Sequence, residues 1–211
     1  SKSVMTSIKS QMNPHFFYNA LNTIQAYIFT NDRDRASNYL AKFSKLTRMI
    51  LEMSEKESIT LAEEITALSL YLELEQMRFQ ENFQFNIDVA PYISKDEVEI
   101  PPMLLQPYVE NAVKHGLLHK EGSKNLNIQI TMSDNDLFVQ IEDNGIGRKR
   151  SAELNSIKNK NHTSFATQAN ERRIEILNKG RQHKIGLEIK DLEDQNQQAI
   201  GTRVSISIPT Q

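Results

Sequence analysis

The chain has 211 residues and contains no cysteine, which excludes disulfide bonds and thiolate metal sites and fits a reducing compartment. It has no apolar run that approaches the roughly 18 residues needed to span a bilayer, and no signal peptide is visible. The net charge is only −2, so no excess of positive charge points to nucleic acid or to an anionic membrane surface. The hydrophobic content of 38% and the charged content of 25% are typical of a globular protein.

Two nucleotide-binding signatures are also missing. The chain contains no GxxxxGK[ST] segment, which excludes a P-loop site, and no VAIK or HRD segment of the protein-kinase type. Any nucleotide chemistry must therefore depend on other motifs.

Charge is distributed unevenly along the chain. Residues 1–57 carry 8 Lys and Arg against 5 Asp and Glu, a balance of +3, whereas residues 58–211 carry 17 against 22, a balance of −5. The length is sufficient for one large domain or two small ones. We therefore predict a domain boundary near residue 58.

The N-terminal part predicts two amphipathic helices. Apolar residues recur at helical intervals through residues 1–30 and again through 34–54, and a polar turn around Asp32 separates the two stretches. Pro14 lies inside the first stretch, where it removes a backbone hydrogen bond and predicts a kink. Two helices joined by a short turn form a hairpin that cannot enclose a core alone, so we expect a four-helix bundle in a symmetric dimer.

The segment NPHFFYN places a histidine and an asparagine one helical turn apart. His15 follows the proline directly, and Asn19 lies on the same face of the helix. One interpretation is a partly buried histidine that hydrogen-bonds a neighbour. The other is a nucleophilic imidazole that accepts a phosphoryl group, with Asn19 positioning a water or an oxygen.

The remaining residues show both helical and strand patterns. Thr60 and Glu63 form a capping box that opens a helix running to about Phe79. Residues 148–166 are polar and lysine-rich, and they predict a mobile loop. Because strands and helices do not alternate strictly, we expect an α+β sandwich with a mixed sheet and helices on one face. The other predicted elements are a strand over 83–89, a helix over 106–116, hairpin strands over 126–130 and 137–141, a helix over 167–179, and final strands near 187–189 and 204–208.

Four polar residues fall on one side of the predicted helix QPYVENAVKHG. Glu110, Asn111, Lys114 and His115 are spaced i, i+1, i+4 and i+5, which places them together on a regular α-helix. They supply an oxygen for a metal, a positive charge for phosphate and an acid–base group, which are the parts of a magnesium–phosphate site. The alternative is an amphipathic surface helix with ordinary polar residues.

Two glycine-containing segments adjoin predicted strands. Asp143, Gly145 and Gly147 form an Asp-x-Gly-x-Gly turn, where the backbone can approach a flat ligand and a buried Asp can accept a hydrogen bond from an exocyclic amine such as adenine N6. Gly201 and Thr202 open the last predicted strand. Taken singly, each segment is also explained by an ordinary turn after a strand or by a hairpin end.

The order of these segments along the chain is specific. NPHFFYN, VENAVKHG, EDNGIG, a polar segment and GTRVSISIP follow one another. In this set the chain resembles the LytS/YehU type of sensor histidine kinase, within the larger group that shares the histidine-kinase ATP-binding domain. The resemblance implies a dimerisation and phosphoacceptor hairpin for residues 1–57 and a Bergerat-type (GHKL-like) ATP-binding α/β sandwich for residues 58–211.

The resemblance also implies roles for individual residues. His15 corresponds to the phosphoacceptor, and Glu110 is the candidate general base. Asn111 would bind Mg²⁺, Asp143 would take the adenine amine, and Arg173 would reach the triphosphate. The implied cofactors are ATP and Mg²⁺, and the implied contacts to them are Asn111, Lys114, His115, Asp143, Gly145, Gly147, Arg173, Gly201 and Thr202.

By the same resemblance, we expect a homodimer that passes the phosphoryl group to the receiver domain of a response regulator, with no nucleic-acid partner. Segments outside this chain would anchor the intact protein in a membrane, and this part would be cytoplasmic.

Two departures from the family pattern leave other interpretations open. Phe16 follows His15, where many histidine kinases carry an acid, so the base must come from elsewhere. Ala166 stands where the family usually has a lid glycine, and this change would weaken ATP binding or lid closure. The alternatives are therefore a catalytically weak nucleotide-binding or scaffold module and an ATPase that does not use His15.

Overall fold

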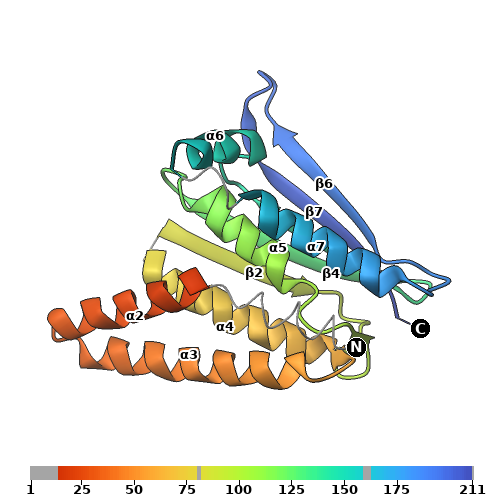
Figure 1. The fold of residues 1–211 in the computed structure, drawn as a ribbon, viewed down its shortest axis with the longest axis horizontal. Coiled ribbons are helices and arrows are strands. Elements are labelled where there is room, and N and C mark those ends of the chain that lie inside the picture. Colours follow the sequence, from red (N-terminus) through yellow and green to blue (C-terminus); the bar gives the residue numbers. More distant parts are fainter. Residues whose placement is uncertain (1–13, 80–81, 159–162, 211) are drawn as a thin grey trace.

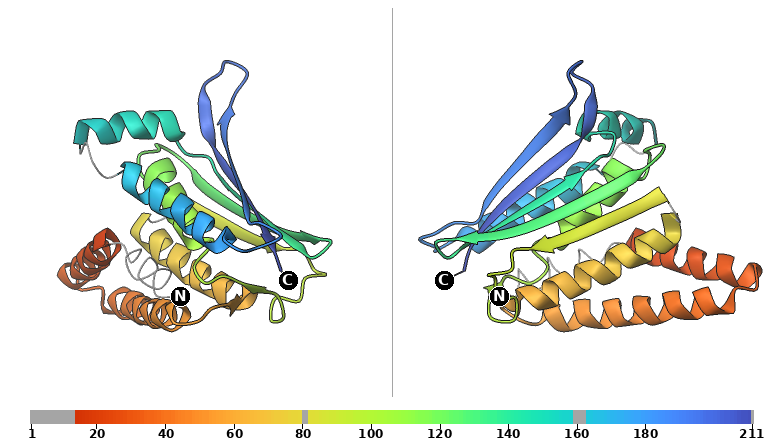
Figure 2. Two further views of the ribbon diagram at one scale, coloured as in Figure 1. Left: turned by 45° about the vertical axis from the view of Figure 1, so that its right-hand side comes forward. Right: turned by 180° about the vertical axis from the view of Figure 1, so that it is seen from behind.

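The structure is a computed structural model that describes residues 14–79, 82–158 and 163–210 (Figure 1). Three helices form one side of the molecule, and further helices lie against one face of a five-stranded sheet (Figures 1 and 2). The predicted α+β class with a mixed sheet is confirmed.

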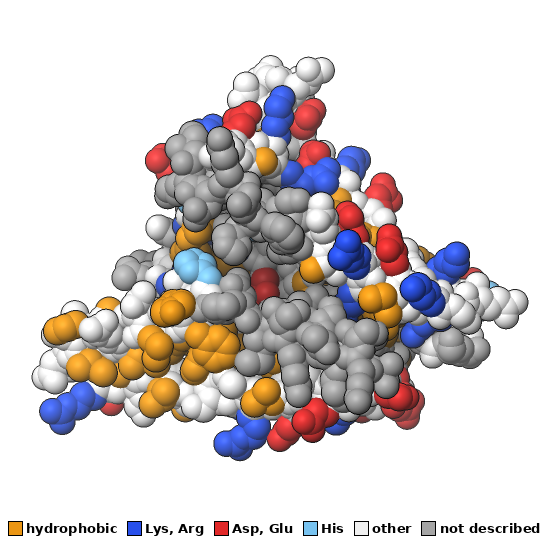
Figure 3. All heavy atoms as spheres, viewed as in Figure 1, with side chains coloured by type: hydrophobic (Ala, Val, Ile, Leu, Met, Phe, Trp, Pro, Cys, Tyr) orange, Lys and Arg blue, Asp and Glu red, His pale blue; other side chains and the backbone are white. Residues whose placement is uncertain are grey.

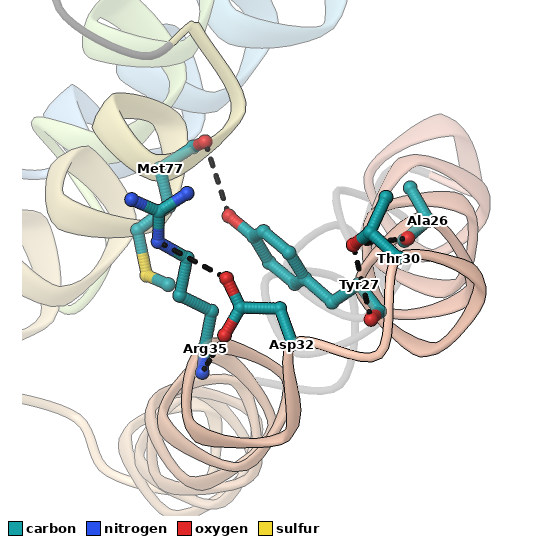
Figure 4. Close-up of polar contacts among 6 residues, drawn as sticks. All are labelled: Ala26, Tyr27, Thr30, Asp32, Arg35 and Met77. Carbon is teal, nitrogen blue, oxygen red and sulfur yellow. Dashed lines mark hydrogen bonds and ion pairs between the residues drawn. The ribbon is translucent and has the colours of Figure 1, made fainter.

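The N-terminal hairpin forms as predicted. It consists of α2 (Pro14–Phe29) and α3 (Arg33–Ser54). The Asp32 carboxylate caps α3 by accepting a hydrogen bond from the Arg35 N–H (3.1 Å), and it also pairs with the Arg35 guanidinium (Figure 4). The predicted kink at Pro14 involves residues that lie outside the described ones.

A third helix, α4 (Leu61–Phe79), packs along the hairpin. The ring centroids of Phe16 and Tyr71 are 5.5 Å apart, and the Tyr27 hydroxyl donates a hydrogen bond to the Met77 carbonyl (3.3 Å; Figure 4). Part of the apolar surface of the hairpin is therefore covered within the chain, and the predicted domain boundary falls between helices that pack together.

The predicted capping box opens α4. The Thr60 hydroxyl accepts a hydrogen bond from the Glu63 N–H (3.1 Å), and the Glu63 carboxylate accepts one from the Thr60 N–H (3.0 Å). Thr60 also belongs to the short strand β1 (Ile59–Thr60), which pairs with β3 (Glu99–Ile100). This pairing holds the start of α4 beside the segment that leads into the next helix.

The strands of the main sheet are β2 (Phe83–Val89), β4 (Lys124–Ser133), β5 (Asp136–Asp143), β6 (Gly186–Glu193) and β7 (Ala199–Pro209). Their order is β2-β4-β5-β7-β6, with β2 parallel to β4 and all other neighbours antiparallel. Ile128, Ile141 and Val204 lie in register across three central strands and are buried, as the alternating pattern predicts. Asp134 and Asn135 have φ of 50° and 66° between β4 and β5, which suits a two-residue type I′ hairpin.

The prediction of a loop over residues 148–166 is wrong. This segment begins with α6 (Arg148–Lys158), and α7 (Thr163–Asn178) starts four residues before the predicted helix. The sequence RKRSAELNSIK contains no glycine or proline and is rich in residues with high helix propensity, so a polar composition was mistaken for irregular structure.

The predicted helix over residues 106–116 forms, but its second half is not α-helical. α5 (Gln106–Asn111) is continued by the π-helix η2 (Ala112–Leu117). The Leu118 N–H accordingly donates to the Val113 carbonyl, five residues back (2.9 Å). The wider turn changes the direction of every side chain after Asn111 relative to the predicted face.

Candidate functional site

A cavity of about 250 Å³ lies between the sheet and the helices. Apolar side chains of β6 and β7 form one wall, and α5, η2, α6 and α7 form the others. Five of the predicted site residues line this cavity, namely Asn111, His115, Asp143, Gly147 and Thr202. The fold thus brings three separate motifs of the sequence to one place.

Two titratable groups in the cavity are shifted by burial. The Asp143 side chain is 5% exposed, and burial raises its pKa to about 6, although its Oδ1 accepts a hydrogen bond from the Gly145 N–H (2.9 Å). Burial, assisted by the positive charge of Lys114, lowers the pKa of His115 to about 4. At neutral pH the His115 imidazole in the cavity is therefore neutral, and a hydrogen-bond donor would stabilise the Asp143 carboxylate.

Glycine is required behind the cavity because backbones meet there without side chains between them. A Cβ on Gly145 would lie 2.3 Å from the Gly116 carbonyl, and the Ile146 N–H donates to the same carbonyl oxygen (3.0 Å). Gly201 has a φ of 150°, and a Cβ there would lie 1.9 Å from the Asp143 carbonyl oxygen. These two glycines therefore hold Asp143 between η2 and β7.

Glu110 and Lys114 do not line the cavity, whereas Asn111 and His115 do, so the predicted role of all four residues in one magnesium–phosphate site stays a prediction. The Glu110 carboxylate accepts a hydrogen bond from Gln106 Nε2 (3.2 Å). Burial raises the Glu110 pKa to about 7, and the negative charge of Glu75 on α4 adds to this. The four polar residues are thus divided between two environments, with Asn111 and His115 at the cavity and Glu110 near Gln106 and Glu75.

An ion pair on α4 escaped the sequence analysis. Glu75 is 3% exposed, and Arg78 donates to its Oε2 from Nε (2.9 Å) and from Nη2 (2.6 Å). The two residues are spaced i, i+3 within a strongly apolar helix, and this spacing was the signal that could have identified the pair. Burial raises the Glu75 pKa, whereas Arg78 opposes that rise.

His15 is exposed on α2 and does not line the cavity. Its partial burial, followed by the positive charges of Lys114 and Arg78, lowers its pKa. The imidazole is therefore neutral at physiological pH, and it shares an environment with Lys114. Asn19 lies one turn further along α2, half-buried and also outside the cavity.

Arg173 is not among the residues that line the cavity, and its contact with a triphosphate stays a prediction. Its side chain is 2% exposed, and it donates to the carbonyls of Met103 (2.5 Å) and Pro102. The buried Glu64 carboxylate accepts hydrogen bonds from the N–H groups of Met103 and Leu105, both at 3.0 Å. Arg173 thus anchors α7 to the segment that enters α5. The Ala166 side chain, which the sequence analysis singled out, lies outside the described residues.

Replacing Glu110 by glutamine is expected to flatten the pH dependence of stability between about pH 4.5 and 7. Because the native pKa of about 7 exceeds the ordinary value of 4.5, the native state retains a proton that the unfolded state has lost. The free energy of unfolding of the wild type therefore falls as pH rises through this window. Urea unfolding at several pH values would measure the free energy of unfolding of both proteins. The difference between the two values cancels the similar contribution of Asp143, which both proteins contain. Parallel curves would contradict the prediction.

The mixed sheet with helices on one face is the fold of histidine-kinase catalytic domains. The structure is similar to the histidine kinase domain from the Erythrobacter litoralis blue-light activated histidine kinase, with a TM-score of 0.54 and 15% sequence identity. The similarity covers 92% of this chain and 91% of that domain.

Sequence comparison identifies the family. The Histidine kinase family matches residues 3–83. Sensor protein LytS of Oceanobacillus iheyensis is 34% identical over 143 residues, which are 68% of this chain and 24% of LytS. Sensor histidine kinase BtsS of Escherichia coli K12 is 37% identical over 144 residues, which are 68% of this chain and 25% of BtsS.

The chain belongs to the LytS type of sensor histidine kinases. It spans about a quarter of the length of these curated relatives. Within the described residues, no helix has both the length and the apolar character required to cross a membrane.

Proposed function

We propose that this chain is the kinase core of a sensor histidine kinase and transfers the γ-phosphoryl group of Mg·ATP to His15. The observation that carries the proposal is the buried Asp143 carboxylate in a cavity that Asn111 and Thr202 also line. A slot with apolar walls and one buried acceptor suits a purine base whose exocyclic amine donates a hydrogen bond. Family membership supports the same assignment.

Asn111 suits a magnesium ion that arrives with the nucleotide. Its amide oxygen is a hard ligand, and Mg²⁺ in kinase sites is held by few protein ligands together with substrate phosphates. Among the residues that the structure describes, no group of three His, Cys, Asp or Glu could hold a metal ion. Bound magnesium would neutralise charge on the β- and γ-phosphates.

The environment of His15 supports its role as the phosphoacceptor. A neutral imidazole nitrogen forms a bond to the γ-phosphorus, the bond between that phosphorus and the β,γ-bridging oxygen breaks, and ADP leaves. Glu110, ionised above its pKa of about 7, accepts the imidazole proton, and Lys114 offsets the added negative charge. Asn19 positions an oxygen of the transferred group. His15 lies outside the cavity. Transfer therefore requires either that α2 moves or that His15 receives the phosphoryl group from a nucleotide bound in the cavity of a second chain.

The hairpin supports assembly as a homodimer. Apolar side chains gather over α2 on one face of the molecule (Figure 3). A second hairpin packed against this surface would complete a four-helix bundle, with residues 1–57 as the dimerisation part and 58–211 as the catalytic part. The exposed large apolar residues of α2 and α3 are Tyr18, Leu21, Ile28, Phe29, Leu40 and Leu51.

The partner that receives the phosphoryl group from His15 is the receiver domain of a response regulator. In the intact protein, further segments would anchor the chain to a membrane, and this part would lie in the cytoplasm.

The proposal is tested with γ-³²P-labelled ATP and magnesium. Wild-type protein is expected to gain acid-labile label and to bind Mg·ATP, whereas Asn111→Ala loses both because it removes the magnesium ligand. Circular dichroism and thermal unfolding would establish that the variant is folded. Label and affinity that persist in Asn111→Ala would reject the assigned site.

One observation favours a second candidate function. Arg173 donates hydrogen bonds to the Met103 and Pro102 carbonyls and does not line the cavity. The cation that the family resemblance assigns to the triphosphate is therefore not at the cavity wall. A nucleotide-binding signalling or scaffold module would bind Mg·ATP without becoming labelled. Binding without label in the wild type would therefore favour this candidate.

A further inference from the structure

Two residues that line the cavity have buried hydroxyl groups with no hydrogen-bond partner among the residues that the structure describes. Tyr108 on α5 is 5% exposed, and Ser151 on α6 is 3% exposed. Both residues line the cavity together with Asn111 and Asp143. Neither belongs to the motif residues to which the sequence assigned a role.

A buried hydroxyl without a partner is unfavourable. Leaving such a group unsatisfied costs about 1–3 kcal/mol, and the great majority of buried polar groups in proteins are hydrogen-bonded. Here two residues with such hydroxyl groups, on different helices, line the same cavity. This coincidence indicates an occupant of the cavity that supplies hydrogen-bonding groups to both.

The position of Tyr108 indicates which part of the occupant it contacts. At one end of the cavity, Gly116 packs against Asp143, since a Cβ on Gly116 would lie 2.7 Å from Asp143 Oδ1. Tyr108 lies eight residues earlier, on α5, which is roughly two helical turns before Gly116. It is one turn before Asn111, and the nearby Glu171 of α7 also lines the cavity. Tyr108 is therefore separated from Asp143 by about two turns of the helical segment that lines the cavity.

We propose that the Tyr108 hydroxyl donates a hydrogen bond to the phosphate chain of a nucleotide bound in this cavity, and that the Ser151 hydroxyl contacts the same nucleotide. The inference rests on the proposed function, because a base amine at Asp143 directs the phosphates toward Asn111 and Tyr108. Burial raises the pKa of Tyr108 to about 12, so the hydroxyl keeps its proton and acts as a neutral donor.

The test compares wild type with Tyr108→Phe, Ser151→Ala and the control Tyr92→Phe. Tyr92 is exposed, and its hydroxyl donates to the Met132 carbonyl outside the cavity. Calorimetry measures Mg·ATP and Mg·ADP binding, and NMR titration measures adenosine binding. Tyr108→Phe is expected to bind Mg·ATP and Mg·ADP about tenfold more weakly with unchanged adenosine affinity, while Tyr92→Phe binds all three like the wild type. The melting temperature of nucleotide-free Tyr108→Phe should not fall, because the lost hydroxyl has no partner among the described residues.

Each other outcome overturns part of the inference. Unchanged Mg·ATP affinity in Tyr108→Phe, or an equal loss for adenosine, rejects the phosphate contact. A lower melting temperature with unchanged affinity assigns Tyr108 to packing alone. Unchanged nucleotide affinity in Ser151→Ala removes Ser151 from the site. Failure of the wild type to bind Mg·ATP rejects the proposed function itself, which distinguishes the two failures.

Discussion

Replacing His15 by alanine is expected to abolish acid-labile labelling from Mg·ATP while leaving nucleotide affinity unchanged. The imidazole is the only nucleophile assigned to the transfer, so its removal leaves no acceptor nitrogen. Binding persists because His15 does not line the cavity. Acid-stability analysis of the labelled protein and calorimetric titration of Mg·ATP measure the two properties separately.

A matched control is His183→Ala, which removes another exposed imidazole from a loop between α7 and β6. This variant should label like the wild type. Label that survives in a folded His15→Ala variant would show that another residue accepts the phosphoryl group. Loss of nucleotide binding in that variant would contradict the separation of His15 from the cavity.

Replacing Gly145 by alanine is expected to destabilise the protein by about 2–3 kcal/mol and to abolish Mg·ATP binding. The added Cβ would lie 2.3 Å from the Gly116 carbonyl, so η2 and the turn after β5 must move apart. That movement displaces Asp143 from the cavity wall, because the Gly145 N–H holds its carboxylate. Urea unfolding and calorimetric titration test the two effects.

Gly122→Ala is the contrasting control for this prediction. Gly122 has a φ of 83°, but apart from its chain neighbours no described residue has an atom within 4 Å of the position that an alanine Cβ would take there. Alanine at this position therefore adds only backbone strain of about 1–2 kcal/mol, and the variant should retain nucleotide binding. Equal nucleotide affinity in wild type and Gly145→Ala would show that the close approach to Gly116 is not needed for the site.

Local patterns predicted most elements of the fold. The capping box at Thr60 and Glu63 forms with both reciprocal hydrogen bonds, and the alternation around Ile128 and Ile141 places both in the core of the sheet. These features depend on residues close in sequence, so a single chain stretch contains the required information. The segment 148–158 was misassigned because polar helices lack the apolar periodicity on which the prediction relied.

The candidate site was predicted only in part. Asp143 and Thr202, both singled out in the sequence, are paired in register between β5 and β7. Glu75, Tyr108 and Ser151 were missed, because their burial and their neighbours arise from contacts between separate elements. No local pattern distinguishes a tyrosine that lines a cavity and has an unpaired hydroxyl group from a tyrosine packed in the hydrophobic core.

The sequence by itself determined where most helices and strands occur and which glycine positions adjoin strand ends, because periodicity and backbone freedom act over a few residues. Only the tertiary structure decided how the polar residues around Asn111 are divided. Asn111 at the end of α5 and His115 in η2 line the cavity, whereas Glu110 lies beside Gln106 and near the negative charge of Glu75 on α4. It likewise decided that Arg173 binds the Pro102 and Met103 carbonyls, since a buried guanidinium must satisfy its donors with whatever acceptors the fold brings within reach.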